Sequence, residues 1–368
     1  MVRGRLSLKS QPANAFVFTV LLCLIALSAG CVISPRRIVG VGSPTPTPNP
    51  GSPSPTPTPV PGAPGKLYVA DSNNNSILRF DNANTADGNL APAATISGAL
   101  TLLNSPHHIF VDSNSDTLYV ANQGNVLAFD GVSTKSANAA PRSISGNLTG
   151  LTAPVDVGVD SSKNLLYVAD GRDVFVFANA STVTGNTAFE HDIHAGFVIS
   201  ALFVDSANDR LYLADAATNT IDVYDGASGL NLTVPPTRTI SGTATQLNQP
   251  SGIAIDALGK LIISNKGTTS TNSSITIYVN AAGAQGNIPP QVTITGAGTT
   301  LNAAGQIAVN NSSTLVELFV ANVAGGNVPI FSDLGAKSGN VSPSRNINGS
   351  ATGLSASGIG GITLDSNR

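Results

Sequence analysis

Polar side chains that could do chemistry occur at one recurring position of this 368-residue chain, just before a short apolar run that returns along the sequence. In chain order the residues at that position are His108, Asp156, Ala201, Gly252, Gln306 and Gly361. Imidazole, carboxylate and carboxamide groups coordinate cations and bind polar ligands, and the first two also transfer protons. His108 and Asp156 belong to consecutive repeats. We therefore expect them to face each other across neighbouring loops and to form, with Gln306, a polar ligand site.

The small residues that share this position argue against a metal cage, because calcium sites usually converge six or more oxygen ligands. We predict no catalytic residue, no metal ligand and no resident cofactor, and we keep a divalent cation at the same site as the alternative. A loop histidine that only hydrogen-bonds its neighbours is the simpler interpretation of His108, and its neighbour His107 is a weaker candidate. His191 and His194 look like a metal pair, but residues three apart on a strand point to opposite faces.

An apolar segment built on Leu-Tyr-Val-Ala sets the architecture. It returns at intervals of 51, 48, 45, 50 and 57 residues, and its copies begin at Leu67, Leu118, Leu166, Leu211, Leu261 and Leu318. That interval is typical of a four-stranded propeller blade, and three further short elements accompany the copies. The first two elements of a repeat are apolar at nearly every position, as expected where both faces of a sheet are covered by neighbouring blades. The sequence predicts an all-β chain, a six-bladed β-propeller of four-stranded antiparallel blades.

The two ends of the repeat array predict how the ring closes. The folded part opens at Lys66 on the second strand of a blade and ends at residues 362–365 on the first strand of one. We expect the C-terminal strand to join the N-terminal blade, which would cover two exposed strand edges.

Aspartate follows many of these strands, which suggests either a ladder of calcium ligands or a recurring turn. Several equivalent positions hold asparagine instead: Asn122, Asn265, Asn310 and Asn322. Both residue types cap turns by bonding nearby backbone, so their interchange favours turn chemistry.

The unit Pro-Ser-Gly-Ile-Ala-Ile-Asp at residues 250–256, followed by a turn and a strand like Leu-Tyr-Val-Ala-Asp at residues 166–170, resembles the NHL-type repeat of six-bladed propellers. The resemblance covers the chain after residue 65. It implies a group that includes sugar-lactone hydrolases, streptogramin lyases and amidating lyases, together with modules that only bind. Those enzymes hold a metal at the mouth of the central channel, so the resemblance makes His108 and Asp156 the residues to test for catalysis.

The N-terminal 65 residues have the composition of an export signal and a spacer. Three basic residues precede an apolar segment at 16–29, and the sequence Leu-Ser-Ala-Gly-Cys at 27–31 resembles the lipobox of bacterial lipoproteins. We expect a signal peptide at 1–30, lipid attachment at Cys31, and a Pro/Thr/Ser-rich stalk at 31–65 before the propeller at 66–368. Ten prolines in residues 43–65 favour extended polyproline II. Ordinary secretion, with Cys31 incidental, is the alternative.

Composition narrows the function further. Removing Arg3, Arg5 and Lys9 from the 18 basic residues leaves 15 against 21 acidic ones, a net charge of −6 that disfavours nucleic acid. We expect an exported, lipid-anchored monomer facing the periplasm or the cell surface, a non-catalytic binding or scaffold module for a protein or an envelope glycan. A metal-assisted hydrolase or lyase is the alternative. The absence of tryptophan disfavours a pyrroloquinoline-type redox propeller.

Overall fold

The computed structural model describes residues 65–269, 272–311, 316–335 and 337–368. The predicted signal peptide, Cys31 and all but the last residue of the predicted stalk lie outside these ranges. Within them the strands form six four-stranded sheets whose neighbours are antiparallel, which confirms the predicted six-bladed β-propeller. No helix in the described ranges is long and apolar enough to cross a membrane.

Each blade is named here from its innermost strand outward. Blade one is β24 (Ile359–Asp365), β1 (Lys66–Asp71), β2 (Ser76–Asp81) and β3 (Ala94–Ser97). Blade two is β4 (Ile109–Asp112), β5 (Thr117–Asn122), β6 (Asn125–Asp130) and β7 (Arg142–Ile144). Blade three is β8 (Pro154–Asp160), β9 (Leu165–Asp170), β10 (Asp173–Ala178) and β11 (His191–His194).

The second half of the ring continues the pattern. Blade four is β12 (Ala201–Asp205), β13 (Arg210–Asp215), β14 (Thr220–Asp225) and β15 (Arg238–Ile240). Blade five is β16 (Pro250–Ile255), β17 (Leu261–Asn265), β18 (Ser274–Tyr278) and β19 (Val292–Thr295). Blade six is β20 (Ala304–Asn311), β21 (Val316–Asn322), β22 (Val328–Ser332) and β23 (Arg345–Ile347). Short 3-10 turns connect strands at η1 (Ala99–Thr101), η2 (Val132–Thr134), η3 (Ala227–Gly229), η4 (Thr243–Thr245), η5 (Ala297–Thr299) and η6 (Ser350–Thr352).

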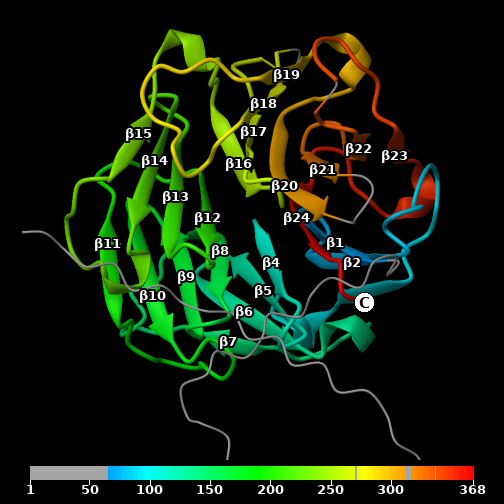
Figure 1. Ribbon diagram of the computed structural model, residues 1–368. Coiled ribbons are helices and arrows are strands. Elements are labelled where there is room, and N and C mark those ends of the chain that lie inside the picture. The colour runs from blue at the N-terminus through cyan, green and yellow to red at the C-terminus, as the bar shows by residue number, and fades with distance from the viewer. Residues whose placement is uncertain (1–64, 270–271, 312–315, 336) are drawn as a thin grey trace, which may run out of the picture. The chain divides into compact units, whose positions relative to one another are not determined.

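The ring closes through the last strand, as predicted. β24 pairs antiparallel with β1, and Lys66 lies opposite Asp365 while Val69 lies opposite Ile362. Figure 1 shows red β24 beside blue β1, with the innermost strands of all six blades gathered around the centre. The first and last described parts of the chain therefore share one sheet. The edges of β1 and β24 that would otherwise be open pair with each other.

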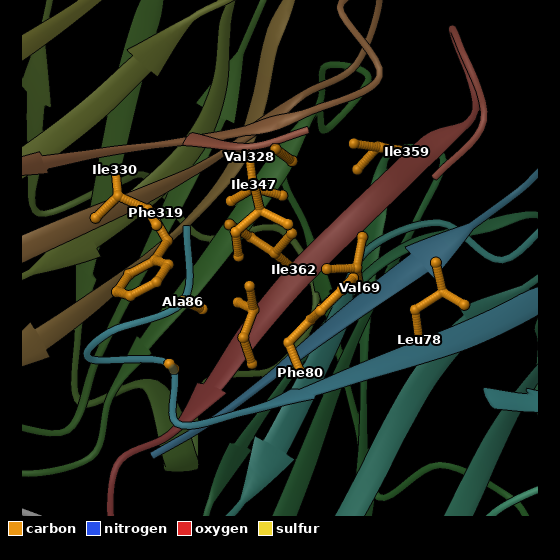
Figure 2. Packing of buried hydrophobic residues seen from close by; sticks show 13 residues of the cluster. Val69, Leu78, Phe80, Ala86, Phe319, Val328, Ile330, Ile347, Ile359 and Ile362 are labelled. Carbon is orange, nitrogen blue, oxygen red and sulfur yellow. The ribbon is translucent and has the colours of Figure 1, made fainter. Parts of the chain in front are cut away.

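Hydrophobic cores lie between neighbouring blades, which explains why the inner strands are apolar on both faces. All six residues of β5 and of β9 are buried. Figure 2 shows the core between blades one and six, where Val69 and Phe80 pack against Phe319, Ile330 and Ile347. Each such fully buried side chain contributes roughly 1.5–3 kcal/mol to folding, so every blade depends on both neighbours.

A recurring side-chain lock joins the outer parts of neighbouring blades. In five blades the outer strand leads into a turn whose threonine hydroxyl donates to a glycine carbonyl three residues earlier, at 2.7–2.8 Å. An asparagine of the next blade accepts a hydrogen bond from a backbone N–H of that turn, at 2.6–2.8 Å. We call this pair of contacts the asparagine lock. Its asparagines are Asn89, Asn138, Asn186, Asn287 and Asn340.

The recurring aspartates cap turns, as the sequence indicated. Asp112 Oδ1 accepts from the Asn114 backbone N–H at 3.0 Å, and Asp160 Oδ1 accepts from that of Ser162 at 3.0 Å. Asn122 instead holds the loop that enters its own blade, since its Oδ1 accepts from the backbone N–H of residue 104 at 2.7 Å. These contacts use the carboxylates and amides to order the backbone.

Candidate functional site

His108 and Asp156 lie where the inner strands of blades two and three begin. His108 immediately precedes β4, and Asp156 is the third residue of β8. The structure places His108 Nδ1 3.0 Å from Asp156 Oδ2, and both side chains are largely shielded from solvent. The oxygen is not aligned with the ring nitrogen as a hydrogen bond requires, and this buried nitrogen has no other partner among the described residues.

Both oxygens of Asp156 are engaged by the backbone. Oδ1 accepts from the Val157 N–H at 2.8 Å, and Oδ2 accepts from the Leu202 N–H of β12, also at 2.8 Å. The second bond reaches from blade three to blade four, at the edge of the inner strand that faces the channel. A buried backbone N–H without a partner costs free energy, so this carboxylate stabilises the ring itself.

Gln306 serves the same purpose across a wider span. Its Oε1 accepts from the Ile362 N–H at 2.9 Å and from the Ile109 N–H at 3.1 Å, while its Nε2 donates to the Ile109 carbonyl at 2.9 Å. One side chain on β20 thus joins blade six to β24 of blade one and to β4 of blade two. It does not contact His108 or Asp156 through any of these bonds.

The small residues at the same repeat position make room for these contacts. A Cβ at Gly252 would lie 2.6 Å from the Gly305 carbonyl oxygen, and one at Gly361 would collide with Gln306 Oε1. Ser72, near the same ring, also donates a hydrogen bond across a blade boundary, to the Pro106 carbonyl at 2.5 Å. The sequence analysis interpreted this repeat position as a ring of ligand groups. It did not predict that Asp156 and Gln306 form hydrogen bonds to the backbone of other inner strands.

Three cavities follow the axis of the ring. The entry cavity, about 360 Å³, lies where the inner strands begin and is lined by residues including His107, His108 and Lys266. The axial cavity, about 160 Å³, is lined by Asp156 and Gln306 and otherwise mainly by aliphatic side chains. The exit cavity, about 1090 Å³, lies where the inner strands end. The three predicted site residues therefore mark the boundary between the entry and axial cavities.

The electrostatics of the entry cavity favour the neutral form of His107. Burial, and then the neighbouring His108, lower the pKa of His107. His108 and Asp156 would offer a cation two donor groups, fewer than calcium takes, and both carboxylate oxygens already accept backbone hydrogen bonds. Across the described ranges no group of three or more His, Cys, Asp or Glu side chains is arranged to hold a metal ion. The residues present do not fit a metal cage.

The second histidine pair lies on a strand, as the sequence analysis assumed, and that strand is β11 at the outside of blade three. His194 Nδ1 is 2.5 Å from Asp173 Oδ1 on β10, whereas His191 Nε2 is 4.0 Å from Glu190 Oε1. In the register of this sheet His194 lies opposite Asp173 and His191 lies opposite Val176. The two imidazoles therefore meet different carboxylates and do not converge.

Comparison with known proteins supports the fold. No protein-family model matches the chain, and no curated protein matches it. A chain of the nidogen/laminin complex is similar in structure at 13% identity, with a TM-score of 0.56, over 82% of this chain and 97% of that chain. A chain of Kuenenia stuttgartiensis hydrazine synthase is similar at 16% identity with a TM-score of 0.42, over 63% of this chain and 58% of its own length. At 13% identity the likeness to the nidogen/laminin chain concerns the fold alone.

Proposed function

We propose that this protein is a lipid-anchored, extracytoplasmic binding module that does not catalyse a reaction, and that it holds a protein or cell-envelope partner. The propeller fold supports a binding or scaffold module in general terms. The observation that carries the non-catalytic part is the use made of Asp156 and Gln306. Their acceptor atoms are taken by backbone N–H groups of the inner strands.

The location rests on the N-terminal sequence. A basic segment, an apolar segment and small residues before Cys31 support export followed by acylation, and the prolines of residues 43–65 support a spacer. A test is metabolic labelling with palmitate in a bacterial host. The chain should be labelled and recovered with membranes, and Cys31→Ser should abolish both. An unlabelled wild-type chain released to the medium would contradict the anchor.

Partner binding has support from the fold's use elsewhere. A structurally similar chain, with a TM-score of 0.56, belongs to a complex of two proteins, nidogen and laminin. We propose that this propeller likewise acts through contacts on its surface and not through turnover. Immobilised full-length chain should retain envelope components equally well before and after His108→Ala, because Nδ1 of that histidine makes no hydrogen bond.

A hydrolase or lyase of the lactonase type is the second candidate, favoured by the 3.0 Å approach of His108 to Asp156 at the entry cavity. Assays of lactone hydrolysis with calcium, zinc or EDTA would decide between the two. Turnover that requires His108 and is lost in EDTA would replace the binding proposal. We expect no turnover, and no rise in melting temperature with either ion.

A further inference from the structure

The exit cavity contains the clearest departure from the repeat on the channel axis. At one repeat position, two residues before the Asp or Asn at the end of each inner-strand motif, the residues are Phe110, Gly158, Phe203, Ala254, Ala308 and Thr363. Both phenylalanines are only partly buried, and both line the axial and the exit cavities. Stacking of the blades does not require an aromatic side chain at this position, since four blades pack without one. The two rings therefore give the inner end of this cavity aromatic surface.

The rest of the lining mixes aliphatic with polar side chains and carries no positive charge. Exposed Asn114, Ser162 and Asn208 line the cavity together with Asp205 and Asp256. No Lys, Arg or His side chain is among the described residues that line it. Lys266 lines the entry cavity instead, so the two ends of the channel differ in charge.

The carboxylates are already held in place by neighbouring groups. Asp205 accepts from Asn208 Nδ2 at 2.9 and 3.1 Å, and Asp256 Oδ1 accepts from the Leu258 N–H at 2.9 Å. A ligand would therefore meet an ordered polar rim around an aromatic interior. Because the rim is already ordered, binding loses less conformational entropy.

These features match one chemical class. A pyranose ring presents C–H groups that pack on aromatic faces and hydroxyls that donate to carboxylates and amide oxygens. The acidic rim disfavours phosphates, uronic acids and nucleic acids. At about 1090 Å³ the cavity is slightly larger than the roughly 300–1000 Å³ usual for small-ligand sites, which gives room for several sugar units.

We propose that the exit cavity binds a neutral oligosaccharide, with Phe110 and Phe203 as packing surfaces and the Asn208 and Asp205 side chains as hydrogen-bonding groups. This inference rests on the proposed function as a binding module and names a ligand class and a place for it. It concerns the end of the channel opposite His108, so it does not depend on the entry cavity.

Titration calorimetry of the full-length chain, in a detergent without a sugar headgroup, tests the proposal. The probes are chitotetraose and maltotetraose as neutral chains and tetragalacturonate as the acidic counterpart. At least one neutral probe should bind, and tetragalacturonate should bind at least tenfold more weakly. Phe203→Leu keeps apolar bulk but removes the ring, and we expect about fivefold weaker binding from it. Asn208→Ala, at an exposed site, should weaken binding about threefold through one lost hydrogen bond.

Val279→Ser is the matched control, because that exposed side chain lies outside the cavity. It should bind like the unaltered chain, and melting temperatures of all variants check that each is folded. Neutral-probe binding that neither Phe203→Leu nor Asn208→Ala weakens would move the site elsewhere and overturn the proposal. Equal binding of tetragalacturonate would overturn the charge argument. If no neutral probe binds while envelope proteins are retained, the saccharide site is wrong and the binding module stands.

Discussion

The junction between blades four and five and the junction between blades three and four perform the same task with different contacts. At the first, Gly242 opens a 3-10 turn with φ 111°, and Asn287 of the next blade accepts from the Ala244 N–H at 2.7 Å. At the second, β11 is followed by no such turn, and Asn231 accepts from the Asp192 N–H of the strand itself at 3.1 Å. Both junctions keep the parallel backbone bridge between blades.

The difference shows which part of a junction the fold requires. The backbone bridge is present at all six junctions, whereas the asparagine lock is present at five. The repeat from Leu166 to Leu211 is also the shortest, at 45 residues, because the connection after β11 omits the turn. The lock is therefore an added stabilising device that one junction does without, and its energy can be measured against that junction.

The largest effect should come from adding one methyl group at each junction. Gly242→Ala places a Cβ 2.5 Å from Asn287 Oδ1 at a positive φ, so we expect a loss of roughly 2–4 kcal/mol in the free energy of unfolding. Gly196→Ala also sits at a positive φ but meets nothing within 4 Å, and it should cost about 1 kcal/mol. Urea unfolding followed by circular dichroism measures both. Equal losses would show that the asparagine contact contributes nothing.

A double-mutant cycle sharpens the same comparison. Asn287→Ala alone should cost about 1 kcal/mol for its lost hydrogen bond, but in the Gly242→Ala background it also removes the clash. We expect a favourable coupling of about 1–2 kcal/mol between these two changes. The cycle of Gly196→Ala with Asn231→Ala should be additive within about 0.5 kcal/mol. Coupling of the same size at both junctions would contradict the assignment of the lock.

The two kinds of junction should also respond to pH in opposite directions. Arg142 beside Asp130 holds the pKa of that carboxyl below its usual value at a locked junction. Burial, and then Asp173, raise the pKa of Asp192 at the unlocked one. A lowered pKa stabilises the fold above the usual value of the carboxyl, and that stability is lost as pH falls through the folded value. A raised pKa destabilises the fold at neutral pH, and the penalty fades as pH falls through it.

Asp130→Asn should therefore lower the melting temperature at pH 7 and lower it by less at pH 3. Asp192→Asn should raise it at pH 7 and have little effect at pH 3. Differential scanning calorimetry at pH 3, 5 and 7 gives the three values for each variant. Both effects are modest because both side chains are partly solvated. A drop in melting temperature at pH 7 for both variants would contradict the opposite signs.

Much of this architecture could be predicted from the sequence because its signals are local. Apolar runs at about 50-residue spacing define strands, and the positions of Lys66 and Asp365 within their repeats indicate how the ring closes. The asparagine lock was not predicted, although Gly-Asn recurs at 88–89, 185–186, 286–287 and 339–340. Each asparagine acts on the neighbouring blade, so its partner cannot be found from its own repeat.

The candidate site illustrates the same limit. The repeat phase was enough to suggest that His108 and Asp156 are neighbours, and the structure puts their side chains 3.0 Å apart. The repeat phase could not show that Asp156 and Gln306 form hydrogen bonds to backbone groups of other inner strands. Those N–H groups face the channel, and which side chain reaches them depends on how the six strands surround it. The phenylalanines of the exit cavity did carry a signal, since small residues or threonine occupy their position in other blades.

The smallest predicted effect concerns Leu232, the residue of the unlocked junction that bridges to Ile193. Leu232 has φ 63° and is 67% exposed, while the equivalent bridge residue at 286 is a glycine with φ 71°. A leucine in the left-handed region is strained by roughly 1–2 kcal/mol, and a glycine there adds about 0.4–1 kcal/mol of unfolded-state entropy. Leu232→Gly should therefore stabilise the chain by about 0.5 kcal/mol, measured by urea unfolding. Leu232→Ala keeps most of the strain and should leave stability nearly unchanged. A loss of stability in Leu232→Gly would mean that this exposed side chain packs at the junction, and that the blade three to blade four contact has its own side-chain lock.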